Sequence, residues 1–521
     1  MEIFKISGEE RESQKQNEDT EQSHSPAKFE EAIAATGFGK YNYFLLMAVA
    51  VPCINQLLCT VELSYVTPVA QCDLNLTLED RGALNAITFA GMIASGFLWG
   101  YFCDALGRKK IVVYGYLCSG IFGLIAASSM NKTTLITAKF MLGLVMNGPF
   151  AATTSQITEF HSTKYRGLVS ISRGIFFSIG NLIIPLMSWA ILPRHWDFKI
   201  FNYFEFHSWN VFLLMCTLST FLSSLVYTFI PESPKFLMTA GRNDEALRIM
   251  QKVFSVNTGK PMEEFPIKAL EEEVINNPTK KVTVNKKLKQ ELKEVVHIFH
   301  RPHITNLALV CFNVFTLVMS LNTLKLWLPG IFQSISDYTN VHNGTGASMC
   351  IMLGEMIPVN VSSTQECSVD RDNISVYINT FIVAFTRILA FGVSGTFLRL
   401  LGVKTMNIIC CYISGILMLS IYLAYDELIV TILAAIGTSI GSVGENMLIM
   451  LTLEMFPTNL RTIAISIHFT LGRIGTLTGN IVFPYLMHLG CLPPFLFVGV
   501  FAMVCATTSF LYSSIENKPL E

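Results

Sequence analysis

The stretch GYFCDALGRKK (Gly100–Lys110) places one acidic and three basic residues in a short segment between two apolar runs. A long, almost uncharged run (ALNAITFAGMIASGFLWGYF) ends in this stretch, and a second apolar run (IVVYGYLCSGIFGLIAASSM) follows it. A helix needs about 20 apolar residues to cross the ~30 Å hydrocarbon layer of a membrane. We therefore interpret Gly100–Lys110 as a tight, charged turn between two membrane-spanning helices.

The rest of the chain repeats this pattern of apolar blocks. Its 521 residues are 51% hydrophobic and only 14% charged, whereas soluble proteins contain about 25% charged residues. The blocks predict an all-α membrane protein with twelve transmembrane helices in two pseudo-symmetric six-helix bundles. The predicted helices are 41–66, 82–103, 110–130, 134–156, 169–192, 209–230, 304–329, 375–398, 405–424, 427–452, 463–487 and 493–513.

The helices divide the chain into a cytoplasmic N-terminal segment, a first bundle, a cytoplasmic linker with short helices, a second bundle and a cytoplasmic tail. The boundaries are 1–40, 41–230, 231–303, 304–513 and 514–521, and an outer loop (331–374) lies within the second bundle. In the linker, NDEALRIMQKVF and IKALEEEV have helical spacing, and the Lys-rich KKVTVNKKLKQELK is a helix or a solvated connection. The first 27 residues are expected to be disordered and contain no signal-peptide core.

The distribution of charge predicts the orientation. The segment Glu232–Arg301 contains thirteen Lys and Arg, whereas Ile331–Asn373 contains one. The short basic turns fall on the same side as the first segment, and basic turns mark the cytoplasmic side of a membrane. Both termini are therefore expected in the cytoplasm. The net charge of −1 gives no case for a nucleic-acid partner.

All five N-x-[ST] sequons fall on the predicted outer side. Asn131 lies too close to the bilayer to be modified. The glycosylation candidates are Asn75, Asn343, Asn360 and Asn373. Cys350 and Cys367 share the outer loop and are expected to form a disulfide in an oxidising compartment. The plasma membrane and an intracellular vesicle both fit this topology.

The turn at Gly100–Lys110 resembles the signature of the major facilitator superfamily. The resemblance implies a gating cluster that forms when the cytoplasmic side closes. Its members are Asp104, Gly107, Arg108 and Lys109. The turn LRLLGVKT in the second half repeats the glycine and the lysine at Gly402 and Lys404, as expected for an internal repeat.

Further motifs are similar to the branch that holds sugar porters, organic ion transporters and the synaptic vesicle glycoprotein 2 family. An E-x6-R device occurs at equivalent places in the two halves, as Glu159 with Arg166 and as Glu454 with Arg461. PESPKFL is similar to the whole branch, whereas FEFHSWNVF and TVELSYVTPVA are most similar to the vesicle glycoproteins and their relatives. The outer loop is shorter than the lumenal domain of those proteins, and helix 7 lacks the paired glutamines of sugar porters, which argues against hexose.

Ionisable residues inside membrane helices are expensive and mark function. Glu62 and Lys325 lie in the outer halves of equivalent helices, and Arg387 and Glu445 lie at similar depth in helices 8 and 10. We hypothesise two ion pairs, Glu62–Lys325 and Arg387–Glu445, one as an outer gate and the other at the substrate or coupling site. The alternative is that each pair only neutralises itself or that a side chain reaches an interface.

Other polar or aromatic residues in the helices are candidates for contact with a solute. They are Asn55, Gln56, Asn147, Asn446, Lys139 and Trp327. Hydrogen bonds between helices are the alternative for the amides. A Lys139 side chain that extends to the outer interface is the alternative to one that meets an anionic substrate.

The sequence has no P-loop, no Cys/His cluster with metal-ligand spacing and no nucleophile set, so we expect neither an enzyme nor a bound metal or cofactor. The motifs favour a secondary active or facilitative transporter that moves a small organic solute by alternating access, an organic ion rather than a hexose. Protons and the lipid bilayer are the other expected partners, and a monomer is expected. The alternative is a synaptic-vesicle-glycoprotein-like membrane binding protein that keeps the fold and transports little.

Overall fold

The computed structural model contains twelve long helices in two groups of six, which confirms the predicted fold class. The described residues are 26–196, 198–200, 204–271, 303–342, 346–354, 374–456 and 458–512. The first bundle consists of α3 (Lys40–Val69), α4 (Leu78–Leu106), α5 (Arg108–Ala127), α6 (Lys132–Glu159), α7 (Arg166–Ile191) and α8 (Ser208–Thr228). The second consists of α12 (His303–Val341), α14 (Ser375–Leu401), α15 (Val403–Ser420), α16 (Glu427–Met455), α17 (Thr458–His488) and α18 (Leu492–Ser509).

Local capping explains why some helices begin before the apolar run that predicts them. At the start of α4, the Thr77 hydroxyl accepts a hydrogen bond from the Asp80 backbone N–H at 3.2 Å, and the Asp80 carboxylate accepts one from the Thr77 N–H at 3.0 Å. At the start of α6, the Asn131 side-chain oxygen accepts from the Thr134 N–H at 2.8 Å. These caps satisfy N–H groups that lack a partner in the first helical turn.

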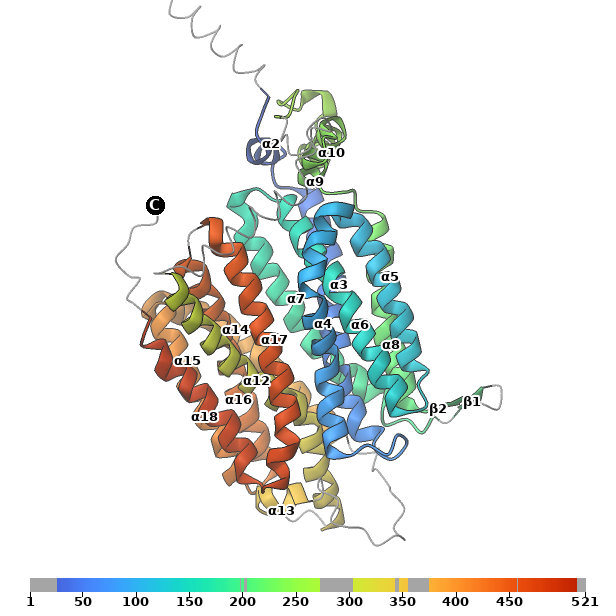
Figure 1. Ribbon diagram of the computed structural model, residues 1–521, viewed down its shortest axis with the longest axis vertical. Coiled ribbons are helices and arrows are strands. Elements are labelled where there is room, and N and C mark those ends of the chain that lie inside the picture. The colour runs from blue at the N-terminus through green and yellow to red at the C-terminus, as the bar shows by residue number, and fades with distance from the viewer. Residues whose placement is uncertain are drawn as a thin grey trace, which may run out of the picture.

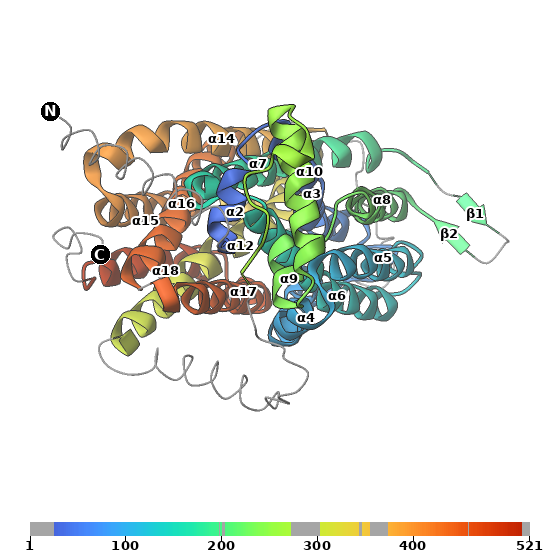
Figure 2. The same ribbon diagram turned by 90° about the horizontal axis from the view of Figure 1, so that it is seen from above.

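The two bundles lie side by side (Figures 1 and 2). The most extensive contacts between them are those of α4 with α17, α7 with α14, and α3 with α12. We call the end of the molecule that carries α9 and α10 the cap face, and the opposite end, which carries α13, the loop face (Figure 1).

A small helical cap covers the first bundle at the cap face. It consists of α2 (Phe29–Ala35), α9 (Pro234–Thr239), α10 (Asn243–Thr258) and the 3-10 turn η2 (Met262–Glu264). Phe29, Met250 and Phe265 are buried in its apolar core. The side-chain oxygen of Asn257 on α10 accepts the Tyr41 N–H at 3.0 Å, which fastens the cap to α3.

The predicted helix in IKALEEEV is wrong for residues 267–271. Leu270 instead forms a parallel bridge with Ala27, and the Glu271 N–H donates to the Ala27 carbonyl at 2.9 Å. This extended segment buries Leu270 in the cap core, a tertiary contact that overrides the helical spacing. The Lys-rich stretch at 280–293 and the N-terminal residues 1–25 lie outside the described residues.

At the loop face, α12 continues to Val341, well beyond the predicted end at 329. The extension has a buried apolar side that includes Ile331, Phe332 and Ile335. The predicted outer loop is therefore partly helical, and a short helix, α13 (Met349–Gly354), follows in it. Between α7 and α8, strands β1 (Phe198–Ile200) and β2 (Phe204–Phe206) pair as an antiparallel hairpin.

The disulfide predicted between Cys350 and Cys367 is wrong. Cys350 on α13 is bonded to Cys491, which immediately precedes α18. The prediction paired cysteines of one loop, whereas the fold brings α13 to the start of a helix far along the chain. Cys367 lies outside the described residues, and Cys72, near the end of α3, is also disulfide-bonded.

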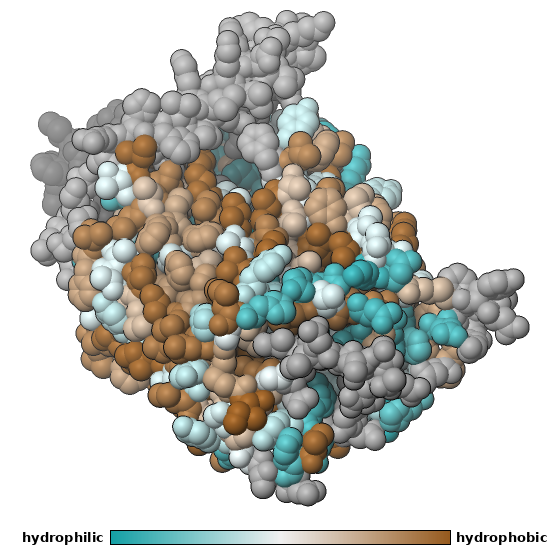
Figure 3. All heavy atoms as spheres, turned by 60° about the horizontal axis from the view of Figure 1, so that its bottom comes forward, coloured by the Kyte–Doolittle hydropathy of each residue, from teal (hydrophilic) through white to brown (hydrophobic). Residues whose placement is uncertain are grey.

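The surface of the bundles is suited to lipid. Ten of the described helices are long and apolar enough to cross a membrane by length and composition, and α4 and α17 match them with 29 and 31 residues. Large hydrophobic side chains such as Phe385, Leu389 and Val393 on α14 are exposed. Figure 3 shows such hydrophobic residues over the flank of the helices and hydrophilic residues gathered toward the loop face.

Candidate functional site

The turn between α4 and α5 is the centre of a polar cluster on the cap face. One carboxylate oxygen of Glu232 accepts the backbone N–H groups of Arg108 and Lys109, both at 3.0 Å. Gly107 has φ +94°, and a Cβ there would lie 2.5 Å from the other oxygen of Glu232. Only glycine combines this backbone with this close approach. The carboxylate also faces the positive end of the α5 dipole.

The Arg108 guanidinium extends this cluster within the first bundle. It donates to the Glu159 carboxylate at 3.3 Å and to the Cys103 carbonyl at 3.2 Å. The Ser233 hydroxyl donates to the second oxygen of Glu159. Arg108 and Glu159, from two predicted gating motifs, thus meet the PESPKFL segment, whose Glu232 and Ser233 were not among the predicted site residues.

The two halves use their turn lysines in the same way. The Lys109 ammonium donates to the carbonyl of Thr228 at the end of α8, at 2.8 Å. The Lys404 ammonium donates to the carbonyl of Phe510, just beyond α18, at 3.2 Å. Lysine at these places satisfies helix C-terminal carbonyls and offsets the negative end of the dipole. Gly402 also has a positive φ, of +75°.

The E-x6-R motifs do not pair internally. Arg166 forms its ion pair with Glu30 of the cap at 2.6 Å, because Glu159 is engaged by Arg108. In the second bundle, Glu454 is exposed, and neither it nor Arg461 is in an ion pair with a described residue. Asp104 lies in the last turn of α4, and its side chain is not part of the described structure.

The predicted Glu62–Lys325 pair is wrong, because Glu62 on α3 pairs with Lys139 on α6. Both side chains are inside the first bundle, with 1% and 0% of their surface exposed. Lys139 therefore does not reach the membrane interface, the alternative weighed for it. The short distance between α3 and α6 in the fold, which spacing along the chain does not reveal, brings the charges together.

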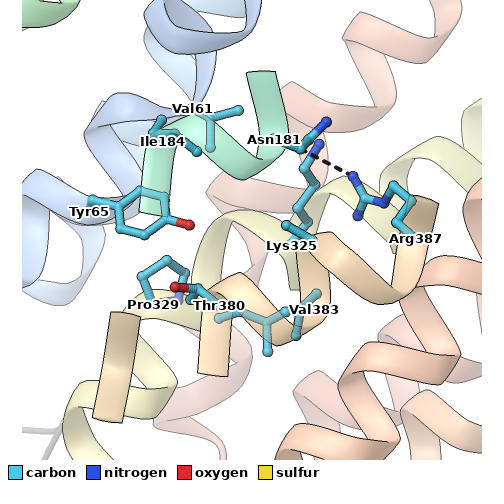
Figure 4. A pocket seen from close by; sticks show the side chains of 11 residues that line it. Val61, Tyr65, Asn181, Ile184, Lys325, Pro329, Thr380, Val383 and Arg387 are labelled. Atoms are coloured by element: carbon cyan, nitrogen blue, oxygen red, sulfur yellow. Dashed lines mark hydrogen bonds between the residues drawn. The ribbon is translucent and has the colours of Figure 1, made fainter. Parts of the chain in front are cut away.

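A small cavity of about 30 Å³ lies between the two bundles. Lys325 on α12 and Arg387 on α14 line it from the second bundle, and Tyr65 on α3 and Asn181 on α7 line it from the first. Figure 4 shows the Lys325 and Arg387 side chains reaching toward Asn181. Arg387 donates to the Asn181 side-chain oxygen at 3.3 Å, a hydrogen bond between the bundles.

Glu445 lies on α16, which packs against both α12 and α14. It acts electrostatically on both Lys325 and Arg387. The predicted association of Arg387 with Glu445 is therefore present as a charge interaction, while the hydrogen bond of Arg387 goes to Asn181. Lys325 belongs to this group and not to Glu62. Asn181 and Thr380, which also line the cavity, were missed, although an amide in the apolar run of α7 was a usable signal.

Three predicted amides make contacts inside the first bundle. Asn55 accepts hydrogen bonds from the hydroxyls of Ser219 and Thr220 on α8, at 2.6 and 2.8 Å. The Asn147 amide donates to the Met92 carbonyl at 3.1 Å. Gln56 is buried and approaches the Met92 sulfur at 3.9 Å. These contacts fit the helix-to-helix role that was the alternative to a role in the site.

Trp327 and Asn446 occupy different positions. Trp327 packs on Phe483, with ring centroids 4.9 Å apart, and lines a second cavity of about 10 Å³ with Arg81 and Asn85. Asn446 is half-buried on α16, next to Glu445. Among the described residues, no group of three or more His, Cys, Asp or Glu is placed to hold a metal ion.

Contacts between the bundles are concentrated toward the loop face. Hydrogen bonds join the bundles. Besides Arg387–Asn181, the Asn85 amide donates to the Leu326 carbonyl at 3.4 Å, and Glu79 meets His488 at 2.7 Å. The Cβ that Gly82 lacks would lie 2.5 Å from the Asn480 carbonyl, so α4 and α17 touch here.

The apolar cores show the same asymmetry. The core of the first bundle near the loop face includes Leu326 and Tyr377 of the second bundle. The core near the cap face, around Tyr41 and Tyr227, contains buried residues of the first bundle and the adjoining cap only. Gly392 and Gly395, in the cap-side half of α14, have open space where a Cβ would be. The bundles are thus closed against each other at the loop face.

These observations define an integral, multi-pass membrane protein built from two six-helix bundles around a charged cavity. The chain belongs to the Major Facilitator Superfamily, whose family model matches residues 41–363. This confirms the resemblance seen in the turn between α4 and α5.

Curated relatives are synaptic vesicle glycoproteins. Synaptic vesicle glycoprotein 2B of Rattus norvegicus is 25% identical over 327 residues, which are 60% of this chain and 48% of the relative. Synaptic vesicle glycoprotein 2C of Mus musculus is 27% identical over 244 residues, 46% of this chain and 34% of the relative. The match thus spans about half of these relatives or less.

Solved structures with the same fold are transporters. The D-xylose-proton symporter has a TM-score of 0.64 at 15% identity, covering 92% of this chain and all of that chain (100%). A bacterial homolog of the human lysosomal transporter Spinster, in its inward-facing and occupied conformation, has a TM-score of 0.61 at 11% identity, covering 91% and 97%. At these identities the likeness shows the fold alone.

Proposed function

We propose that this chain is a secondary active or facilitative transporter that moves a small organic ion across a membrane by alternating access. The observation that carries the proposal is the charged cavity between the bundles, lined by Lys325 and Arg387 on one side and by Asn181 on the other. Charged side chains at such depth are costly and are retained where they bind or relay a solute. The site between repeats is where transporters of this architecture bind their solutes.

The cap face is the cytoplasmic side in this proposal. The basic turn Arg108–Lys110 supports it, because basic residues in short turns favour the cytoplasm. Asn75 is exposed at the other end of the bundle, where a glycan acceptor belongs. Asn343, Asn360 and Asn373 are the further proposed acceptors and lie outside the described residues. With this orientation, the contacts at the loop face close the site to the outside or to a vesicle lumen.

Opening the loop face requires the bundles to rock apart there. The Asn85–Leu326 and Glu79–His488 contacts would break, and the cavity would widen from that side. The Arg108–Glu159–Glu232 cluster lies within the first bundle and its linker, so it would keep the α4–α5 turn rigid while the bundle moves. A gradient of the solute or of protons would supply the energy.

Uptake into proteoliposomes tests the proposal. Purified protein would be offered organic cations, organic anions and hexoses, with and without a proton gradient. We expect uptake of an organic ion above that of protein-free liposomes. A variant with Glu79→Cys and His488→Cys, bridged by a short thiol cross-linker, should lose this uptake and recover it on reduction. Glu79→Cys alone, treated in the same way, is the control.

A membrane binding protein is the second candidate function. The observation that favours it is the cavity volume of about 30 Å³, which is far below the ~300–1,000 Å³ of small-molecule pockets. Folded protein that binds a solute in detergent but takes up none in liposomes would select this candidate and reject the first.

A further inference from the structure

The charges inside the membrane helices are strongly unbalanced. In the described membrane helices, seven Asp, Glu, Lys or Arg residues lie more than five residues from either end of their helix. They are Glu62, Lys139, Arg173, Lys325, Arg387, Glu445 and Arg473. Five are basic and two are acidic. Glu62 neutralises Lys139 in the first bundle, so four basic residues and one carboxylate, Glu445, remain.

Two of the four surplus cations line the cavity. Lys325 and Arg387 come from adjacent helices of the second bundle and converge on Asn181 (Figure 4). Glu445 acts on both of them but can balance only one positive charge. An uncompensated buried cation is costly, so the cavity favours a ligand that brings one negative charge.

The other two basic residues, Arg173 and Arg473, lie on α7 and α17. Arg473 lies at the middle of α17. Among the described residues no carboxylate acts on it. Arg173 lies in the cap-side half of α7, where its guanidinium is 5.8 Å from the Phe150 ring. Neither arginine is in an ion pair with a described residue.

The contact of Arg387 indicates the chemistry of the ligand. Its guanidinium donates to the neutral amide oxygen of Asn181. A carboxylate oxygen in that place would be a stronger acceptor, because it carries a negative charge. Arginine pairs with carboxylates through two parallel hydrogen bonds, and an ammonium adds a third donor. A carboxylate between Lys325 and Arg387 would compete with Asn181, and so would loosen a hydrogen bond that joins the bundles.

We propose that the transported solute is an organic monoanion, a carboxylate held by Lys325 and Arg387, with Glu445 setting its charge at one. This inference rests on the proposed transport function and deepens it. With a monocarboxylate bound, the charges of Lys325, Arg387, Glu445 and the ligand sum to zero. We also expect the selectivity for anions to change when the charge of Lys325 or of Glu445 is removed.

Four matched probes test the inference: benzoate, benzylammonium, benzamide and the dianion isophthalate. Binding is measured as thermal stabilisation of the purified protein, and transport as uptake corrected for flux into protein-free liposomes. We expect benzoate to be favoured at least tenfold over benzylammonium and benzamide. Lys325→Gln should lose benzoate uptake at least tenfold, and Lys325→Arg should retain it.

The Glu445→Gln variant should change the selectivity between anions of different charge, which a purely structural role of Glu445 would not do. The substitution raises the net charge of the site by one. The ratio of isophthalate uptake to benzoate uptake should therefore be at least tenfold higher in the variant than in wild type. The control is Lys132→Gln, a partly exposed lysine that pairs with Asp80 at the loop-face end of α6, which should change neither binding nor selectivity.

The outcomes separate the two proposals. Uptake of benzylammonium with neither binding nor uptake of benzoate would overturn the anion inference and leave transport standing. Benzoate that stabilises wild type but not Lys325→Gln, without uptake, would support the anion site and overturn transport. Folded protein that neither binds nor moves any probe, or a Glu445→Gln variant with unchanged selectivity, would overturn the inference.

Discussion

Replacing Lys139 by methionine will leave the Glu62 carboxylate alone inside the first bundle. Both side chains are at most 1% exposed. Breaking a buried ion pair by removing one partner costs about 3–5 kcal/mol, whereas replacing both partners by apolar residues is close to neutral. We therefore expect Lys139→Met to destabilise the protein by about 3–5 kcal/mol and Glu62→Leu/Lys139→Met to recover most of that loss.

The assay is a double-mutant cycle on the free energy of unfolding in detergent. The coupling between Glu62 and Lys139 should be about 3 kcal/mol or more, and that between Glu62 and Lys325 close to zero. Lys325→Met is the matched control, since it removes a lysine that lines the cavity between the bundles. A large coupling of Glu62 with Lys325, or Lys139→Met without effect, would refute the assignment of the pair.

Three further predictions concern the ends of the bundle. Gly107→Ala, which puts a Cβ 2.5 Å from a Glu232 oxygen at a φ of +94°, should destabilise the protein by about 1–2 kcal/mol, and unchanged thermal unfolding would contradict the close approach. Cys491→Ser and Cys350→Ser should each lower the free energy of unfolding by about 2–5 kcal/mol, and the double variant should lose no more than either single variant. Additive losses would show that the two cysteines are not bonded to each other. Burial lowers the pKa of His161 in the folded protein. As the pH drops below about 6.5, this histidine is therefore protonated in the unfolded chain before it is protonated in the folded protein, and the stability should fall. A His161→Phe variant should flatten that pH dependence between pH 7 and 5, and an identical slope would assign it to another group.

The cap-face turn shows how far local sequence reaches. Gly107, Arg108 and Lys109 were identifiable because a glycine and basic residues between two apolar runs allow few structures other than a tight turn at a membrane surface. Their partner Glu232 is more than a hundred residues away along the chain. The spacing that flagged Glu159 with Arg166 marked the correct place, yet the arginine bound to Glu159 comes from another turn.

The buried charges show where the sequence is insufficient. Glu62, Lys139, Lys325, Arg387 and Glu445 were all recognised as significant, because charge in an apolar helix is rare and costly. Their pairing was not, because residues on different helices meet through packing angles and rotations that the apolar pattern does not specify. A one-residue rotation of a helix moves a side chain by about 100° around its axis.

The sequence by itself determined the membrane class, the twelve helices, the two-bundle architecture and the family. Those features depend on the length and spacing of apolar blocks and on short turns, which are local. Only the tertiary structure decided which charges neutralise one another, that Cys350 bonds to Cys491, and that the bundles close at the loop face. These are contacts between distant segments, and the free energy of each depends on how closely two helices approach in three dimensions.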